Sequence, residues 1–329
     1  MPSTFTSRSH NSNEQSLSRA DVYTRVTDQI VKAIEAGAQD FKMPWHSPGA
    51  SSDYPINLAT GNRYRGVNTL ALWAEAHERH YPEAKWATYR QFAELGLQVR
   101  KGSRSAIGVF WKPFDAQKGD AVESHDAPRD ADDSRTRWIA RAFPLFNIAQ
   151  TEGYEAPTLP PRPGHERIAH AEAFMAAIGA EIRHGGNRAF YRPSDDFIQM
   201  PPFEVFVDPI AYYGTLAHEF GHWTGHESRL NRDLKIRFGD EKYAAEELIA
   251  ELTAAYISAD LGLAPEPKQE NAAYIQNWLK ILKSDKRAIF TAARHAQAAA
   301  DYVHSMQPEP APIAMPTAPA GAAQQQLCL

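Results

Sequence analysis

The chain has 329 residues, 43% of them hydrophobic and 11% aromatic, which is enough for two domains with apolar cores. Its net charge of -5 does not indicate a nucleic-acid partner when averaged over the chain, and its one cysteine, Cys328, excludes a disulfide framework or a thiolate metal site. Without a long apolar run or a signal-peptide core, the protein is expected to be soluble and cytoplasmic, with no membrane partner.

Low-complexity sequence marks both ends of the chain. Residues 1–19 are rich in Ser, Asn and Thr, and residues 307–329 carry prolines followed by Ala, Gly and a Gln run, so both are predicted to be disordered tails. Over residues 21–36 apolar side chains recur at helical spacing, which predicts an amphipathic helix that Gly37 ends. This helix opens an N-terminal domain predicted over residues 20–155.

The rest of the N-terminal domain is predicted to consist of short helices and strands. Helices are expected over residues 70–77 and 86–95. Residues 106–114 carry Ile107, Val109 and Trp111 at alternate positions, which predicts a strand, and a Lys101-Gly102 turn would pair it with residues 97–100.

An acidic segment interrupts the strands. Residues 115–134 contain seven acids against two basic residues and almost no apolar bulk, so we predict an exposed loop there. A strand over residues 137–148 would then pair with the one before the loop.

A proline-rich segment at residues 156–164 has the composition of a linker, so a C-terminal domain is predicted over residues 165–306. It would begin with a helix and short strands, followed by longer helices. The predicted fold class is α+β, with two domains. The predicted first helix and strands lie at residues 165–178, 181–183, 189–191 and 197–200.

The most specific pattern in the chain is His218-Glu-Phe-Gly-His222. A helix is predicted around it, because Asp208 and the following proline form a good helix start and Gly225 a good stop. Residues four apart lie about 40° apart on a helix, so both imidazoles can bind one ion, while Glu219 lies to the side. This predicts a divalent metal site, with Zn2+ favoured and Mn2+ as an alternative.

Zinc needs a third protein ligand. A metzincin would have its third histidine where this chain has Ser228. On a helix predicted over residues 244–261, the spacing of Glu247 and Glu251 resembles the gluzincin arrangement, in which the first carboxylate binds zinc and the second orients a ligand histidine. Glu247 is the predicted ligand and Glu251 the orienting group, with Glu246 as the alternative if the register differs by one residue. The residues that could supply this third ligand are His226, Glu246, Glu247 and Glu251.

Two histidines and one glutamate leave a fourth position for water, whose pKa zinc lowers to about 7. Glu219 would act as general base and proton shuttle, which predicts hydrolysis of a peptide or amide bond in an unknown protein substrate. Five side chains are eligible to stabilise the oxyanion, namely Tyr212, Tyr213, Tyr243, His226 and Arg229.

The local charge of the N-terminal half is basic. Residues 41–114 carry ten Lys or Arg against five Asp or Glu, interleaved with twelve aromatics. This composition suits single-stranded DNA, because cations follow phosphates while rings stack on unpaired bases, although the same rings could form a core. The candidate contacts are Arg63, Tyr64, Arg65, Asn68, Trp86, Tyr89, Arg90, Arg100, Lys101 and Lys112.

Motifs in both halves resemble ArdC-type antirestriction proteins. Those resembling the N-terminal domain, which also begins some plasmid conjugative primases, are Asn57-Leu-Ala-Thr-Gly-Asn-Arg-Tyr-Arg-Gly-Val-Asn68, Trp86-Ala-Thr-Tyr89, Gln98-Val-Arg-Lys-Gly102 and Phe146-Asn-Ile-Ala-Gln150. Those resembling its zincin-like domain are His218-Glu-Phe-Gly-His-Trp-Thr-Gly-His226, Ser228-Arg-Leu-Asn-Arg-Asp233 and Glu246-Glu-Leu-Ile-Ala-Glu251. The resemblance implies a single-stranded-DNA-binding domain joined to a metallopeptidase-like domain, in a protein that shields incoming plasmid DNA from restriction during conjugation.

Three functions fit these features. The first is a DNA-binding protection factor whose metal site is structural or vestigial. The second is a working intracellular zinc peptidase that DNA binding only localises, and the third is a peptidase without a nucleic-acid role. Glu219 favours a competent site, because a purely structural site does not need it.

Overall fold

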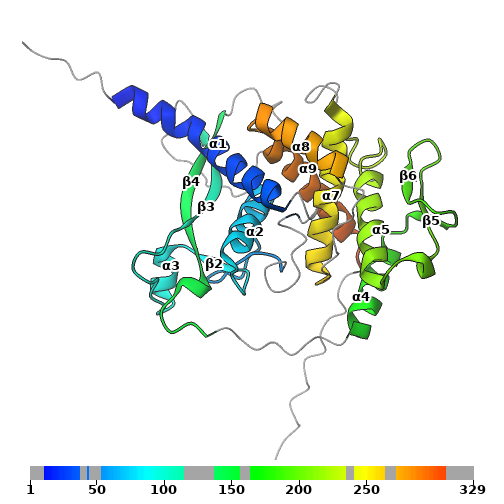
Figure 1. The fold of residues 1–329 in the computed structure, drawn as a ribbon, viewed down its shortest axis with the longest axis horizontal. Helices are drawn as coiled ribbons and strands as arrows, with labels where there is room; N and C mark the ends of the chain where they lie inside the picture. The colour runs from blue at the N-terminus through cyan, green and yellow to red at the C-terminus, as the bar shows by residue number, and fades with distance from the viewer. Residues whose placement is uncertain are drawn as a thin grey trace, which may run out of the picture.

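The computed structural model describes residues 11–37, 43, 53–114, 137–155, 164–234, 241–263 and 272–308 (Figure 1). A sheet with covering helices forms the N-terminal part, and a group of helices with a second, small sheet forms the C-terminal part. The predicted α+β class is confirmed. None of the helices in these ranges is long and apolar enough to span a membrane.

Helix α1 (Asn11–Gly37) ends where the sequence predicts but begins ten residues earlier. It therefore includes much of the N-terminal segment that was predicted to be disordered. Good helix formers such as Glu14, Gln15 and Leu17 in this segment outweigh its serines and asparagines. Of the segments predicted to be tails or loops, residues 1–10, 115–134 and 309–329 lie outside the described residues.

The N-terminal sheet has four strands in the order β1-β2-β4-β3. Strands β3 and β4 pair antiparallel, with Ala106 opposite Leu145 and Phe114 opposite Arg137, which confirms the predicted pairing across the acidic segment. Helix α2 packs against β3 and α1. The elements of this part are β1 (Ile56–Asn57), α2 (Val67–Arg79), β2 (Lys85–Ala87), α3 (Tyr89–Glu94), β3 (Ala106–Phe114), β4 (Arg137–Asn147) and the 3-10 turn η3 (Ile148–Gln150).

Two predictions in this part were wrong. The helix predicted over residues 86–95 begins only at Tyr89, because Thr88 caps it in a capping box with Gln91, while Trp86 pairs in β2 with Asn147. Residues 97–100 form no strand, and Val99 instead makes an isolated bridge to Thr151.

Among the described residues, the C-terminal part combines a three-stranded sheet, in the order β5-β7-β6, with five longer helices. Its strands fall within one residue of the predicted ranges. Helices α5 and α7 pack along each other, and α9 packs on α7. The elements are α4 (Gly164–Ala177), β5 (Glu181–His184), β6 (Phe190–Arg192), β7 (Phe197–Met200), the 3-10 turn η4 (Phe203–Val205), α5 (Pro209–Trp223), α7 (Lys242–Asp260), α8 (Ala272–Ser284) and α9 (Ala288–Ser305).

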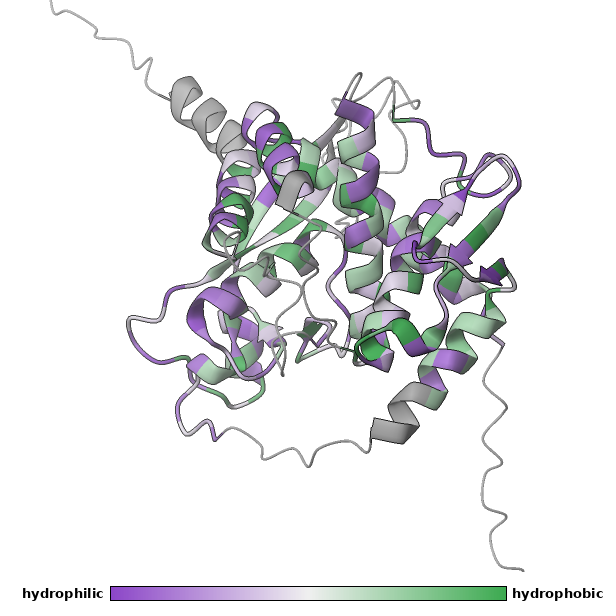
Figure 2. Cartoon of the chain, turned by 45° about the vertical axis from the view of Figure 1, so that its right-hand side comes forward, coloured by the Kyte–Doolittle hydropathy of each residue, from purple (hydrophilic) through white to green (hydrophobic). Residues whose placement is uncertain are grey.

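One apolar core joins the two parts. It contains buried side chains from α1, α2 and β3 together with others from α5, α7, α8 and α9, and in Figure 2 hydrophobic stretches run along these helices. The Tyr256 ring of α7 lies 5.8 Å from Trp73 of α2 and 6.1 Å from Tyr54, measured between centroids. The two halves are therefore packed together. Residues 156–163 of the predicted linker lie outside the described residues.

Candidate metal centre and nucleic-acid contacts

The His-Glu-x-x-His motif lies on α5, whose start the sequence dictates. Asp208 has extended backbone angles and its carboxylate accepts a hydrogen bond from the Ala211 N–H at 2.7 Å, while Pro209 occupies the first helical position. The helix ends at Trp223 with Thr224 as C-cap, so it stops just before the predicted Gly225. His218 and His222 consequently lie one turn apart on the face that meets α7.

Gly221, inside the motif, sets the distance between α5 and α7. A Cβ added at Gly221 would lie 2.7 Å from the Ala250 Cα and 3.1 Å from its Cβ. No real Cβ comes that close to a backbone atom, so the two helices touch through their main chains here. The glutamates of α7 are thereby brought within reach of the histidines.

Gly221→Ala should lower the free energy of unfolding by about 1–3 kcal/mol, because the added methyl group forces α5 and α7 apart. Helix propensity alone predicts the opposite sign, a gain of up to about 1 kcal/mol. Urea unfolding monitored by circular dichroism decides between them. An unchanged or raised stability would show that the helices accommodate the methyl group.

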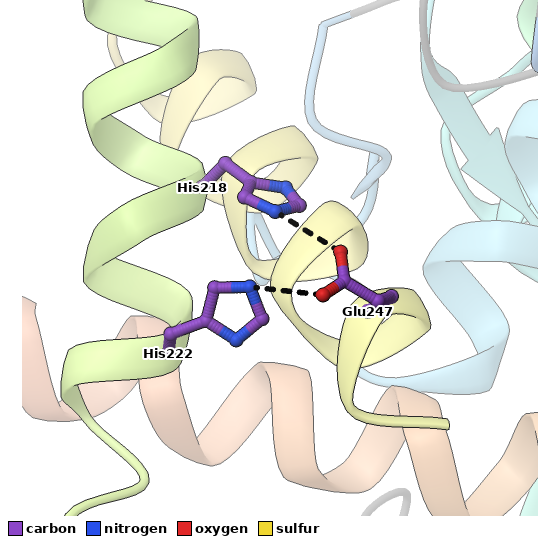
Figure 3. Close-up of side chains that lie close together, drawn as sticks. All are labelled: His218, His222 and Glu247. Carbon is purple, nitrogen blue, oxygen red and sulfur yellow. Dashed lines mark ion pairs between the residues drawn. The ribbon is translucent and has the colours of Figure 1, made fainter. Parts of the chain in front are cut away.

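His218, His222 and Glu247 form the metal-ligand cluster found within the described residues (Figure 3). One ligand atom from each lies within 4.8 Å of the others. The Glu247 carboxylate faces both rings, with 3.6 Å from His218 Nε2 to Oε2 and 3.7 Å from His222 Nε2 to Oε1. Ligands about 2.1 Å from a tetrahedral Zn2+ lie about 3.4 Å from each other, so these atoms fit a metal ion with small adjustments.

The other nitrogen of each ring faces a second carboxylate of α7. His218 Nδ1 lies 3.5 Å from Glu251 Oε2, and His222 Nδ1 lies 3.4 Å from Glu246 Oε1. Carboxylates in this position fix the orientation of a ligating imidazole and raise its basicity. Glu251 lies beside His218, and the orienting role predicted for it stays a prediction. Glu246, the alternative ligand, faces His222 from the side away from Glu247.

The cluster carries excess negative charge that a cation would balance. Burial disfavours protonated His218, but its contacts with Glu247 and Glu251 outweigh this and raise its pKa to about 10. Burial likewise opposes ionisation of Glu247, yet the two histidines hold its pKa below the usual range. The three carboxylates of Glu246, Glu247 and Glu251 around two imidazoles give the cluster a negative charge that a divalent cation would balance.

Arg232 is a part of the site that the sequence analysis did not single out. Its guanidinium is buried and donates hydrogen bonds to both oxygens of Glu246 and to the Gly221 carbonyl. Although burial opposes ionisation of Glu246, these bonds lower its pKa to about 2. Glu246 is therefore paired with Arg232, and Glu247 is the carboxylate that lies between both histidines. Arg232 lies within the Ser228–Asp233 motif, and this motif is the sequence signal that points to it.

Two further groups complete the surroundings. Glu219 is 6% exposed and close enough to influence the charge of His218. Tyr243, one turn before Glu247 on α7, is 62% exposed and its hydroxyl lies 3.2 Å from that of Tyr274. Contacts with Tyr274 and the Glu247 carboxylate raise the pKa of Tyr243, so it remains a hydrogen-bond donor.

The other candidates for the oxyanion are held elsewhere. Arg229 pairs with Asp196 and lies over the Trp223 ring. Tyr212 contacts His184, Tyr213 contacts Glu172, and His226 contacts Ser228. Of the five eligible side chains, Tyr243 is the one in contact with the cluster.

Three predicted DNA contacts are structural residues in this fold. Trp86 is 0% exposed, and Tyr64 packs in the same small core. The Asn68 side chain donates to the Val109 carbonyl and accepts from its N–H, at 2.8 and 2.7 Å. Their prediction as DNA contacts is wrong for the folded domain, because the rings that should stack on bases fill the core instead.

Arg63 and Arg65 bind the C-terminal part. Arg63 pairs with Asp260 at the end of α7, and Arg65 pairs with Asp301 of α9. Next to them, the Gly66 N–H donates to Gln297 Oε1 and the Tyr256 hydroxyl donates to the Gly66 carbonyl, each at 3.0 Å. The Arg-Tyr-Arg-Gly motif thus connects the two halves.

Arg63→Ala should lower stability, because it leaves the Asp260 carboxylate, whose side chain is 6% exposed, without this partner. A loss of about 1–3 kcal/mol in urea unfolding is expected. Arg90→Ala is the matched control, since the Arg90 side chain is 89% exposed and pairs with Glu94, one turn away on the surface. Equal stability of both variants would contradict an anchoring role for Arg63.

The remaining candidates are accessible but differ in their surroundings. Tyr89 is 50% exposed and accepts a hydrogen bond from Gln98, and Lys101 is exposed. The Arg100 guanidinium donates hydrogen bonds to the carbonyls of Ala149 and Thr151. Lys112 lies on β3 with its Nζ 5.5 Å from the centre of the Phe110 ring.

Comparison with known proteins defines both parts. Residues 20–146 match the family model for the N-terminal domain of anti-restriction factor ArdC, and residues 169–295 match that for a zincin-like metallopeptidase. The chain is thus an ArdC-type N-terminal domain followed by a zincin-like domain. These ranges fall inside the predicted domains, whose outer boundaries remain predictions.

Full-length relatives give the family. The chain is 50% identical over 287 residues to the uncharacterized protein y4eC of Sinorhizobium fredii, covering 87% of this chain and 92% of that protein. Crystal structures of the antirestriction ArdC protein from the R388 plasmid, metal-free and Mn(II)-bound, are 40% and 39% identical, with TM-scores of 0.70 and 0.67. They cover 87% and 88% of this chain and are themselves covered to 98% and 99%. The chain belongs to the ArdC family of antirestriction proteins.

A longer relative shares only part of its length. DNA primase TraC of Escherichia coli is 37% identical over 293 residues, which is 85% of this chain but 27% of the primase. Most of that primase therefore lies outside the region that is similar to this chain.

Proposed function

We propose that this protein is an antirestriction factor that binds single-stranded DNA, protects incoming plasmid DNA during conjugation, and carries a divalent-metal site in its zincin-like domain. The observation that supports the site most strongly is the convergence of His218, His222 and Glu247 within 4.8 Å. The Mn(II)-bound structure of an ArdC relative is consistent with a divalent ion, and Zn2+ remains our preferred ion from the ligand types. The protein would act in the cytoplasm.

Hydrolysis of a peptide bond is the reaction that these side chains support. A divalent ion held by His218, His222 and Glu247 would polarise a carbonyl group and acidify water. The Glu219 carboxylate would accept a proton from the attacking water and deliver it to the leaving amine. The Tyr243 hydroxyl would donate a hydrogen bond on the exposed side of the site.

A working peptidase of unknown substrate, merely localised by DNA, is the alternative function. Glu219 favours it, because this buried carboxylate is adjacent to the ligands without being one of the three. If the protein is instead a DNA-binding protection factor with a structural metal site, Glu219 would be dispensable for its function.

Glu219→Gln separates the two functions. The purified protein, loaded with Zn2+ or Mn2+, would be tested for cleavage of casein and of host restriction subunits, and for binding of a labelled single-stranded oligonucleotide and the matching duplex. We expect Glu219→Gln to abolish cleavage while it preserves metal content and DNA affinity, because the amide cannot accept the proton. Cleavage that survives in the variant would exclude Glu219 as the base. Failure to bind single strands more tightly than duplex would remove the DNA-binding proposal.

A further inference from the structure

Arg232 reaches the metal-ligand cluster because the chain folds back after α5. Asn231 has a φ of 44°, in the left-handed region that asparagine tolerates better than most residues, and this residue turns the chain. Backbone hydrogen bonds then hold the returning segment against the end of the helix, among them one from the Arg232 N–H to the Gly225 carbonyl at 3.0 Å. The Arg232 side chain, which is 1% exposed, therefore lies against the last turn of α5.

Gly225 makes room for the Arg232 guanidinium. A Cβ added at Gly225 would lie 2.7 Å from a terminal nitrogen of Arg232 and 3.0 Å from its Cζ. Gly225 does not have a positive φ, so the backbone at this position does not itself require glycine. What the position requires is space, because a buried guanidinium held by hydrogen bonds can make way for a methyl group only by giving up some of those bonds.

The guanidinium of Arg232 donates hydrogen bonds in three directions. Two of its nitrogens donate to the two carboxylate oxygens of Glu246, with 2.8 Å from Nε to Oε2. The nitrogen that reaches Oε1 also donates to the Gly221 carbonyl at 2.7 Å, and the third nitrogen lies 3.3 Å from the Thr224 hydroxyl oxygen. A planar guanidinium that binds both oxygens of a carboxylate fixes the plane of that carboxylate as well as its position. Arg232 therefore holds Glu246 in one orientation toward α5.

Glu246 in turn orients His222. Its Oε1 lies 3.4 Å from His222 Nδ1, while His222 Nε2 faces Glu247 at 3.7 Å. A carboxylate beside one ring nitrogen favours the tautomer with the proton on that nitrogen, which leaves the other nitrogen as the metal-binding atom. The same guanidinium binds the carbonyl of Gly221, the residue directly before His222. Arg232 thus contacts both the carboxylate that faces the His222 ring and the backbone that carries it.

We propose that Arg232 is a positioning residue of the metal site, which acts through Glu246 to hold the His222 ring with Nε2 directed at the ion. This inference rests on the proposed metal site and deepens it by a residue that is not itself a ligand. Arg229 provides the contrast within the same segment. Its side chain is 7% exposed and donates to the Trp223 carbonyl at the end of α5, but its carboxylate partner is Asp196, outside the cluster.

The test measures the Zn2+ affinity of the full-length protein by competition with a chromogenic chelator. We expect Arg232→Leu to weaken Zn2+ binding by about 10- to 100-fold, the range for a group that orients a ligand. Arg232→Lys should also weaken binding, because an ammonium group keeps the charge but cannot bind both carboxylate oxygens in one plane. Gly225→Ala should do so with Arg232 still present, since it displaces the guanidinium. Arg229→Leu is the matched control and should leave the affinity unchanged.

A double-mutant cycle separates positioning from a general contribution to the fold. If Arg232 acts through Glu246, Arg232→Leu should cost little further Zn2+ affinity in a Glu246→Ala background, so the two losses do not add. Additive losses, or unchanged affinity in Arg232→Leu, overturn the proposal and leave the metal site standing. Thermal unfolding of each metal-free variant checks the fold.

If Arg232→Leu does not fold, Arg232→Lys and Gly225→Ala decide in its place, and unchanged affinity in both overturns the proposal. Absence of Zn2+ binding in the unaltered protein overturns the proposed metal site and this inference with it.

Discussion

His218→Ala and His222→Ala should each abolish stoichiometric metal binding, because each removes one of three converging ligands. The unaltered protein should hold about one divalent ion per chain after loading and desalting, measured by elemental analysis. Bound metal should also stabilise the fold, by about 2.7 kcal/mol when the free ion is at a hundred times its dissociation constant. A metal-dependent rise in melting temperature should therefore disappear in both variants.

His226→Ala is the control for this experiment. It removes a nearby imidazole that contacts Ser228 and lies outside the ligand cluster, so metal content should stay unchanged. Full metal content in both His218→Ala and His222→Ala would rule out the site. Loss in His226→Ala alone would mean that the ion lies toward the end of α5 instead.

The glutamates should follow a defined order in the same assay. Glu247→Ala should cause the largest loss, since its carboxylate faces both rings. Glu251→Ala should weaken binding by about 10- to 100-fold, as expected for a group that orients a ligand. If Glu246→Ala lowers metal binding as much as Glu247→Ala does, Glu246 has a role in metal binding beyond its ion pair with Arg232. The expected order of these effects follows from the contacts of each carboxylate in the structure, which sequence spacing alone does not give.

Local sequence signals were sufficient for the helix that carries His218 and His222. Asp208 and Pro209 fix the start of α5, and the four-residue spacing then places both histidines on one face. The helix carrying Glu247 could be predicted, but not its register against α5, because that depends on the contact of Gly221 with Ala250. A glycine inside a helix indicates that another backbone comes close to it, but the sequence does not tell which residue that is.

Long-range pairing was the information that the sequence did not contain. Arg63 and Arg65 look like phosphate contacts beside a tyrosine, but their partners, Asp260 and Asp301, lie 197 and 236 residues away. Trp86 looks like the start of a helix, yet it joins strand β2, where its partner is Asn147 of β4, well outside the local pattern. Composition therefore identified a basic and aromatic region correctly but could not tell core rings from exposed ones.

Trp86→Ala should destabilise the protein by about 3–5 kcal/mol, the range for truncating a large buried aromatic side chain. The indole is fully buried against Tyr81, whose ring centroid is 5.7 Å away, and in the small core around Leu145. Urea unfolding followed by circular dichroism measures the loss. Such a cost is a large fraction of the 5–15 kcal/mol that typically stabilises a folded domain, so part of the protein would be unfolded near 37 °C.

Trp86→Phe and Tyr89→Ala are the controls. Phenylalanine keeps most of the apolar contact and removes an indole N–H that finds no acceptor among the described residues, so its cost should be much smaller than that of alanine. Tyr89 is 50% exposed, and its truncation should change stability by less than about 1 kcal/mol. If Trp86 stacked on DNA instead, Trp86→Ala would leave the unfolding curve in place and weaken oligonucleotide binding by about 1–3 kcal/mol. We expect the reverse, because a ring without exposed surface can reach a base only after the domain has opened.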